Sequence, residues 1–446
     1  MRDLLVITLV LGLVPFILAR AWIGVLAWAW IGLMNPHQLG WGAATTFPAA
    51  MIIGGATLIS LVFAPDKKAP PMNVAMVCIL LMAIFYTLKL PFAWLQAFAP
   101  AQWVKVMKIL LMTFVTGALI YGEQRIKWLL WTIIFSIGFY GFKGGLFSLL
   151  TGGQHQVLGP QTTFIAGNTE IGLVMIMVLP LILVAAQQAK QKWLRLLCYA
   201  TFWLSIPAIV FTYSRGALIG LAVTFFFVFF KMRRKPLVVL MLVPVLIAGV
   251  AFTPEKLFDR AETIKEYEED DSAMQRLQAW SVAKNIALRH PLAGAGFELE
   301  RLESPIWLTY ADFMGRWENR TKAAHSIYFQ ILGEHGFVGL ILFLAMLVGT
   351  LATLSRARRQ LKAIPEAQWL SAYAGAMQIG MYGYMVTGAF LSLAYFDLLY
   401  TYVVLAAIIG REAAARHAAT LKSAPPRYNY SPVALGEPAA TRQAAS

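Results

Sequence analysis

Arg215 is the residue whose surroundings most suggest chemistry with a phosphate. It follows Ser214 in a short turn between two apolar segments. Its planar guanidinium matches the oxygens of a phosphate or pyrophosphate, and Gly216 would let such a ligand approach the backbone. We therefore group Ser214, Arg215 and Gly216 as a candidate phosphate site. The alternative is an arginine at a helix end that extends to the membrane surface without binding a ligand.

His325 is the second candidate, and it lies where a long hydrophilic segment returns to an apolar one. An imidazole titrates near neutral pH and can accept a proton from a hydroxyl, so His325 could serve as a general base. The alternative is an interfacial histidine with no chemical role, because His often occupies half-buried positions. His335 lies nearly three helical turns deeper and could share a site with His325 only if the helix broke near Gly333.

The elements that must position these residues are membrane-spanning helices. Hydrophobic residues make up 59% of the 446, and charged residues only 13%, against about 25% in soluble domains. Apolar stretches of roughly 20 residues recur, each long enough to cross a bilayer. Lipid cannot satisfy backbone polar groups, and residues 173–186 do not alternate as in a β-barrel. We therefore predict an all-α polytopic membrane protein.

The apolar segments predict about 12–13 transmembrane helices and one large, partly helical periplasmic loop. The predicted spans are 4–19, 21–34, 48–64, 72–90, 103–121, 127–142, 169–186, 194–212, 216–231, 236–252, 327–354, 369–389 and 393–410. The predicted divisions are an N-terminal transmembrane bundle at 1–252, the periplasmic loop at 253–325, C-terminal transmembrane helices at 326–410, and a disordered cytoplasmic tail at 411–446.

Basic residues in short loops predict the orientation of these helices, because such residues are retained in the cytoplasm. The clusters that we place there are Lys67-Lys68, Lys190/Lys192/Arg195, Lys231/Arg233/Arg234/Lys235 and Arg356/Arg358/Arg359/Lys362, with Arg411 and Arg416 after the last span. The loop then lies outside, in the periplasm of a Gram-negative cell.

This orientation leaves Lys105 and Lys108 at an outer helix end, where basic residues are disfavoured. Both either extend to the membrane surface or bind an anion. Glu170 is either a salt-bridge partner for such a lysine or a site acid. The net charge of +15 fits positive-inside topology and contact with anionic membrane lipids. The basic residues are scattered among short loops, so we expect no nucleic-acid binding.

Part of the long loop has helical spacing. Ser272–Arg289 places Met274, Leu277, Trp280 and Ala287 near one face, which predicts a helix. His290-Pro291 should end it, and Gly294 and Gly296 should form turns. We expect the loop's aromatic side chains to rest at the membrane interface. These are Trp307, Tyr310, Phe313 and Trp317.

Several of these motifs resemble the O-antigen ligase and polymerase superfamily. His325-Ser326 followed by Gly336-Phe337-Val338-Gly339 resembles the signature that closes that family's large periplasmic loop. The turn at Ser214-Arg215-Gly216 is similar to the family's other hallmark. The remaining similarity is to the loop pattern, at Arg276, Trp280, His290-Pro291 and Gly294-Ala295-Gly296. The resemblance extends over roughly residues 100–410.

Within the superfamily, the chain most resembles the O-glycosylation ligases associated with the exosortase A system. The segments that carry this likeness are Met34–His37, Gly144–Gly153, Gly159-Pro160 and Ala324–Gly339. The chain departs from the subgroup at Gly167–Glu170, where only Asn168 and Glu170 look retained.

The resemblance implies a glycosyltransferase that takes a glycan from undecaprenyl pyrophosphate on the outer face of the bacterial inner membrane. It implies no nucleotide sugar, no metal and no other cofactor. Arg215 would stabilise charge on the departing pyrophosphate, with Arg276, Lys105 and Lys108 as weaker candidates. His325 would accept the proton of the attacking acceptor hydroxyl, and a single displacement would invert the anomeric centre.

Three other functions stay open at this point. A polysaccharide polymerase would use the same carrier. A lipid-glycan transporter or flippase would need polar residues along several spans, and 216–231 and 236–252 have none at mid-span. An inert membrane scaffold would bind partners through the loop and the tail. No nucleotide-binding loop, Ser-His-Asp hydrolase signature or metal-ligand spacing is found in the sequence.

Overall fold

The computed structural model describes residues 2–231, 271–315 and 320–423 and contains only helices and loops within them. The N-terminal helices are α1 (Arg2–Ala19), α2 (Ala21–Met34), α3 (Ala49–Phe63), α4 (Val74–Lys89), α5 (Ala99–Leu119), α6 (Gly122–Leu150), α7 (Asn168–Gln188), α8 (Lys192–Val210) and α9 (Arg215–Lys231). The later helices are α12 (Asp271–Arg289), α13 (Ser304–Leu308), α14 (Ile327–Leu361), α15 (Gln368–Thr387) and α16 (Asp397–Ser423).

Eight of the described helices are long and apolar enough to cross a membrane, and α3 and α9 are shorter apolar helices. The all-α, multi-pass membrane architecture predicted from the sequence is therefore confirmed. The described helices also lie close to the predicted spans. Residues 236–252, which would form one further span, lie outside the described residues, so the predicted total remains a prediction.

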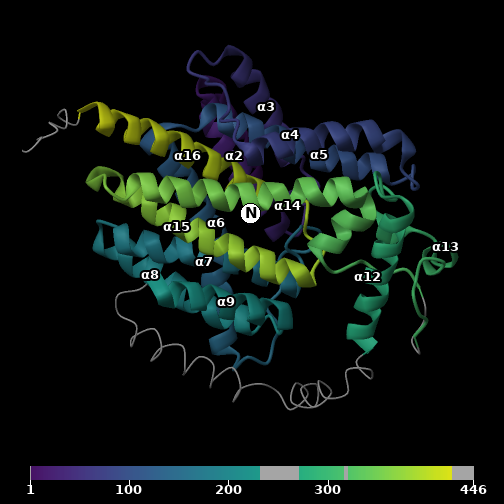
Figure 1. Ribbon diagram of the computed structural model, residues 1–446. Helices are drawn as coiled ribbons and strands as arrows, with labels where there is room; N and C mark the ends of the chain where they lie inside the picture. Colours follow the sequence, from purple (N-terminus) through teal and green to yellow (C-terminus); the bar gives the residue numbers. More distant parts are fainter. Residues whose placement is uncertain (1, 232–270, 316–319, 424–446) are drawn as a thin grey trace, which may run out of the picture.

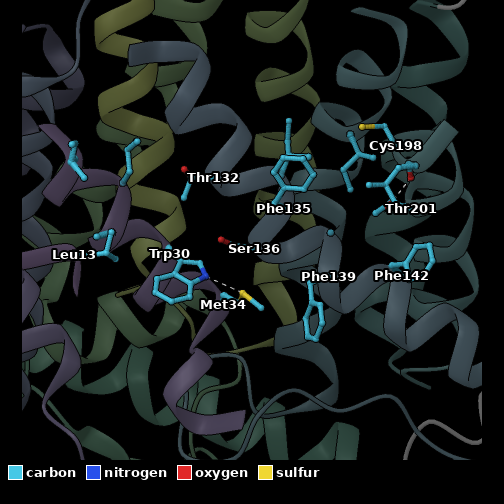
Figure 2. A pocket seen from close by; sticks show the side chains of 17 residues that line it. Leu13, Trp30, Met34, Thr132, Phe135, Ser136, Phe139, Phe142, Cys198 and Thr201 are labelled. Atoms are coloured by element: carbon cyan, nitrogen blue, oxygen red, sulfur yellow. Dashed lines mark hydrogen bonds between the residues drawn. The ribbon is translucent and has the colours of Figure 1, made fainter. Parts of the chain in front are cut away.

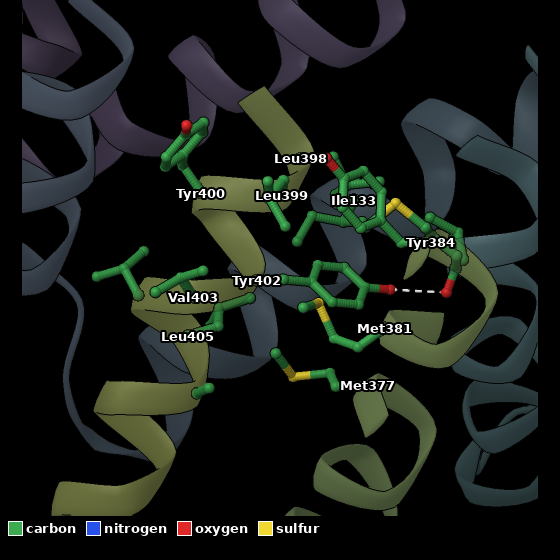
Figure 3. Packing of buried hydrophobic residues seen from close by; sticks show 14 of the residues in the cluster. Ile133, Met377, Met381, Tyr384, Leu398, Leu399, Tyr400, Tyr402, Val403 and Leu405 are labelled. Atoms are coloured by element: carbon green, nitrogen blue, oxygen red, sulfur yellow. Dashed lines mark hydrogen bonds between the residues drawn. The ribbon is translucent and has the colours of Figure 1, made fainter. Parts of the chain in front are cut away.

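The long helices pack side by side, and α12 and α13 lie beyond one end of the bundle (Figure 1). The core is formed mainly by α6, α7, α14, α15 and α16. Figure 3 shows part of it, with Tyr402 of α16 beside Met377 and Met381 of α15. The Tyr402 hydroxyl donates a hydrogen bond to the Met177 carbonyl oxygen at 2.8 Å. This hydrogen bond and the packing around it hold α7, α15 and α16 together.

The basic clusters predicted for the cytoplasm lie, where described, at the end of the bundle away from α12. Contacts across this end join segments that are distant in sequence. The Lys68 backbone N–H donates to the Ala118 carbonyl oxygen, and the Arg411 guanidinium donates to that of Ala69. Arg233, Arg234 and Lys235 lie outside the described residues.

Two predictions at the chain's C-terminal part and long loop need correction. Helix α16 continues to Ser423, so residues 411–423 are not disordered, because alanine-rich sequence favours helix. Trp307 is not at the membrane interface. It is 1% exposed and packs with Ala279, Val282 and Ile286 in a small core within the loop. Trp317 lies outside the described residues.

The predicted loop helix is present as α12, and it ends at Arg289 directly before His290-Pro291. Its buried apolar side chains are Ala279, Val282, Ala283, Ile286 and Ala287. Gly294 and Gly296 both have positive φ, as their predicted turn positions require.

Candidate functional site

Arg215 is the first residue of α9, and its turn is held by the residues before it and by α7. The Ser214 side-chain oxygen accepts from the Ala217 backbone N–H at 3.2 Å, which caps the helix. The same oxygen lies 2.8 Å from the Thr169 hydroxyl of α7. Ser214 is buried, whereas Arg215 is exposed. Ser214 therefore positions the turn and the guanidinium extends from it.

A second set of contacts anchors the turn to the α6–α7 connection. The Thr212 carbonyl oxygen accepts from the side-chain amides of Gln156, at 2.9 Å, and Asn168, at 3.0 Å. The Tyr213 hydroxyl donates to the Gly153 carbonyl. Tyr213 itself has a φ of +54°, an unusual conformation for a bulky residue and one that clusters at functional sites.

Gly216 lies against the side chain of Phe390 rather than beside open space. A Cβ at this position would lie 2.9 Å from the Cβ of Phe390, and a Cβ at Gly388 would lie 2.7 Å from Ile327. The turn at 388–390 therefore packs against the first residues of both α9 and α14. It brings Arg215 and His325, far apart in the sequence, to the same end of the bundle.

His325 lies just before α14 with a φ of +44°, the second non-glycine of the site in this conformation. Its side chain stays accessible to solvent. Trp280 of α12 donates through Nε1 to the neighbouring Ala324 carbonyl at 2.7 Å. Partial removal of water from the ring, followed by the positive charges of Arg276 and Lys322, lowers the pKa of His325 below its ordinary value. The imidazole is therefore mainly neutral at pH 7, as a general base requires.

Arg276 comes from α12 and is half-buried, close enough for its charge to act on His325. Lys105 and Lys108 lie exposed on α5, which packs against α2, α4 and α16. Figure 1 shows α5 across α14 from α9. The charge of Arg276 thus acts on His325, whereas Lys105 and Lys108 lie on a helix on the other side of α14 from α9.

The helices α7, α9 and α14 are among those that begin at this end. A helix N-terminus carries partial positive charge and unpaired N–H groups, and it favours anions. Glu170, in the first turn of α7, forms no salt bridge with a described residue, and its carboxylate lies over Gly167. The arrangement can therefore hold an anion close to a neutral imidazole.

The sequence did not single out Thr169 or Asn168 as supports of this turn. Their neighbourhood departs from the subgroup pattern, yet both contact the Arg215 turn. The only sequence signal for this role was the presence of two polar side chains at the start of a transmembrane helix. Their partners lie more than 40 residues away, so the sequence did not indicate what they contact.

The described residues form neither a metal site nor a second polar site. No group of three or more His, Cys, Asp or Glu side chains that could hold a metal is present among them. A groove of about 620 Å³ lies between α1, α2, α6, α7 and α8 (Figure 2). Its lining is almost entirely apolar, with Trp30, Phe135 and Phe139 prominent, so it suits hydrocarbon rather than a charged group.

Comparison with known proteins divides the chain into two parts. Residues 1–190 match a family of unknown function (DUF5935). No curated protein matches the chain. Residues 200–344, which include Arg215, Arg276 and His325, match the family described as O-Antigen ligase, and this supports a place for the chain in the O-antigen ligase and polymerase superfamily.

Proposed function

We propose that this protein transfers a glycan from undecaprenyl pyrophosphate to an acceptor hydroxyl on the periplasmic face of the bacterial inner membrane. The observation that carries the proposal is the location of Arg215 and His325 at one end of the bundle, joined through the turn at 388–390. The basic clusters described at the opposite end favour a cytoplasmic location for that end. The match to the O-Antigen ligase family supports glycan transfer in general.

The chemistry requires a stabilised leaving group and a base. When the bond between the anomeric carbon and the pyrophosphate oxygen breaks, negative charge builds on the pyrophosphate. Arg215 and Arg276, with the helix N-termini of α7, α9 and α14, stabilise that charge where water is scarce. Lys105 and Lys108 are less suited to this role, because they lie on another face.

His325 accepts the proton of the acceptor hydroxyl as its oxygen attacks the anomeric carbon. One displacement inverts that centre, and the free undecaprenyl pyrophosphate leaves as the second product. The low pKa of His325 keeps its acceptor nitrogen unprotonated at neutral pH. The acceptor hydroxyl in this proposal belongs to a protein, a lipid or a polysaccharide.

The test is reconstitution of the purified protein in proteoliposomes with an undecaprenyl-pyrophosphate-linked glycan and a hydroxyl acceptor. We expect release of free undecaprenyl pyrophosphate, and its loss in Arg215→Ala and His325→Asn. Asparagine tolerates the positive φ of position 325, so this variant separates chemistry from folding. Normal transfer by both variants would contradict the proposal. Chain lengthening with a single lipid-linked repeat and no other acceptor would instead identify a polymerase.

A further inference from the structure

Helix α14 is broken at Gly336, whose φ of +64° and ψ of −165° are not helical. A break within a membrane helix frees backbone groups that lipid cannot satisfy. A Cβ at Gly336 would lie 2.5 Å from the Pro291 carbonyl oxygen, so only glycine fits here. The Phe337 N–H donates to that same carbonyl at 2.8 Å. The break is therefore filled by the long loop, which enters it directly after α12.

The loop also satisfies the carbonyl groups before the break. The Ala295 N–H donates to the Gly333 carbonyl oxygen, and the Gly296 N–H donates to that of Glu334, both at 2.9 Å. We call the contact between residues 290–298 and 333–337 the loop–helix junction. The loop motif and the α14 motif, far apart in the sequence, are therefore joined through their backbones.

Two buried residues hold this junction: Lys89 from α4, and Glu334 within the junction itself, which also contacts Tyr395. The Lys89 ammonium, at the end of α4, donates to the carbonyl oxygens of Ala293, at 2.6 Å, and Glu334. It therefore joins the loop to α14. The Glu334 carboxylate accepts from the Glu298 N–H at 3.1 Å and from the Tyr395 hydroxyl at 2.5 Å. Lys89 is 6% exposed and Glu334 is 2% exposed.

Burial of charged groups is costly unless they are hydrogen-bonded. Lys89 and Glu334 both form hydrogen bonds with residues of this junction. The void between α12 and α14 is only about 10 Å³. A Cβ at Gly333 would lie 3.1 Å from that of Ala283, so α12 rests directly on α14. Two contacts fix how α12 lies against the segment that carries His325. One is the loop–helix junction at the C-terminal end of α12, and the other is the hydrogen bond from Trp280 to the Ala324 carbonyl oxygen.

From this geometry we infer that Lys89 and Glu334 are positioning residues, which hold Arg276 of α12 beside His325. The inference rests on the proposed function for its kinetic consequences, but its structural part can be measured independently. Lys89 and Glu334 contact no substrate in this role. They act through the backbone of the loop–helix junction.

The experiment combines distance and rate measurements. Spin labels are attached at Leu288 of α12 and Ile341 of α14, both more than 60% exposed, after Cys78 and Cys198 are replaced by alanine. We expect a narrow distance distribution in the parent and a broad one in Lys89→Met and Glu334→Leu. In the transfer assay, kcat/KM should fall about 100-fold, the cost of a small misplacement remote from the chemistry.

A pH profile separates positioning from simple loss of folded protein. Arg276 and Lys322 are the charged groups that lower the pKa of His325. If Lys89→Met moves Arg276 away, the acidic limb of the profile shifts to higher pH, whereas fewer folded molecules would lower the rate at every pH. Glu334→Gln keeps an acceptor for the Glu298 N–H and should stay near the parent. The matched control is Lys143→Met, at an exposed lysine of α6.

An unchanged distance distribution and an unchanged acidic limb in Lys89→Met would overturn the inference. If that variant does not fold, Gly296→Ala disturbs the same junction from the loop side, because its Cβ would lie 2.6 Å from that of Ala93. If the distance distribution broadens in the variants but the parent protein itself transfers no glycan, the result contradicts the proposed function and still supports the positioning role.

Discussion

The two ends of the helix bundle treat their charges differently. At the end away from α12, which we call the paired end, basic side chains meet acidic ones. Arg125 pairs with Asp66, Lys127 lies 2.5 Å from Glu123, and Arg416 lies 3.6 Å from the same carboxylate. The other end, which we call the site end, also has ion pairs, Lys284–Asp312 and Arg301–Glu298. The charges acting on His325, however, are both positive.

The backbone differs between the ends as well. The non-glycine residues with positive φ in the described part of the chain are all at the site end: Asn35, Thr162, Tyr213, Glu298 and His325. Each such conformation costs of order 1–3 kcal/mol. The comparison teaches that the paired end consists of ordinary helix ends joined by ion pairs, whereas the site end places basic side chains near His325 on turns of uncommon backbone conformation.

The largest expected effect comes from the same substitution made at both ends. Arg215→Lys should lower kcat/KM about 100-fold although it keeps the charge, because the planar fork that holds two phosphate oxygens is lost. Arg416→Lys at the paired end should stay within about twofold, since exposed ion pairs contribute little. The measurement is the rate of undecaprenyl pyrophosphate release in proteoliposomes. An equal decrease in kcat/KM for Arg215→Lys and Arg416→Lys would contradict the proposed difference between the two ends.

Arg276→Gln should have the next largest effect. Loss of a charge-assisted hydrogen bond to the pyrophosphate should raise the KM for the lipid-linked donor about tenfold. Lys284→Gln provides the control on the same helix, because Lys284 is exposed and pairs with Asp312. Steady-state kinetics with varied donor would measure both. A change in kcat alone, with KM unaffected, would place Arg276 outside the donor site.

Lys322→Gln should give a smaller effect, visible in the pH profile. The Lys322 charge disfavours protonation of His325 and lowers its pKa. Removal of that charge raises the pKa, so activity should be lost at a higher pH as the solution is acidified. The KM for donor at pH 8 should not change. An acidic limb that stays in place would show that another group titrates in that range.

Asp66→Asn should have the smallest effect, and none on transfer. Its pair with Arg125 is at the paired end and Asp66 is 44% exposed. The free energy of unfolding should fall by less than about 1 kcal/mol, measured as a small decrease in thermal stability in detergent. Reduced transfer at equal stability would show that the paired end communicates with the site.

Most of the helical architecture was predictable because hydrophobic length is a local property. The predicted span 169–186 corresponds to α7 at Asn168–Gln188, and 327–354 lies within α14. The extent of α16 was not predicted. The alanine-rich stretch after Arg411 was grouped with the polar, proline-rich residues that follow it and was therefore expected to be disordered. The candidate residues Arg215 and His325 were found from residue type, unusual position and resemblance, and their roles remain proposals.

The break in α14 shows the limit of such reasoning. The sequence indicated that His335 could join His325 only through a break near Gly333. The helix does break, at Gly336, but His335 is buried and its Nε2 lies 2.5 Å from the Tyr395 hydroxyl. Which side of a break a side chain occupies depends on the segments that pack there, and these come from elsewhere in the chain.

The sequence by itself determined the membrane class and most of the helix positions, because both depend on the solvation of a continuous stretch of residues. Only the tertiary structure decided that Lys89 and Glu334 meet at the loop–helix junction across 245 positions. It also decided that Arg276, rather than Lys105 or Lys108, acts on His325. Helix packing sets these neighbours, since the low-dielectric interior requires every broken backbone bond and buried charge to find a partner, wherever in the chain that partner lies.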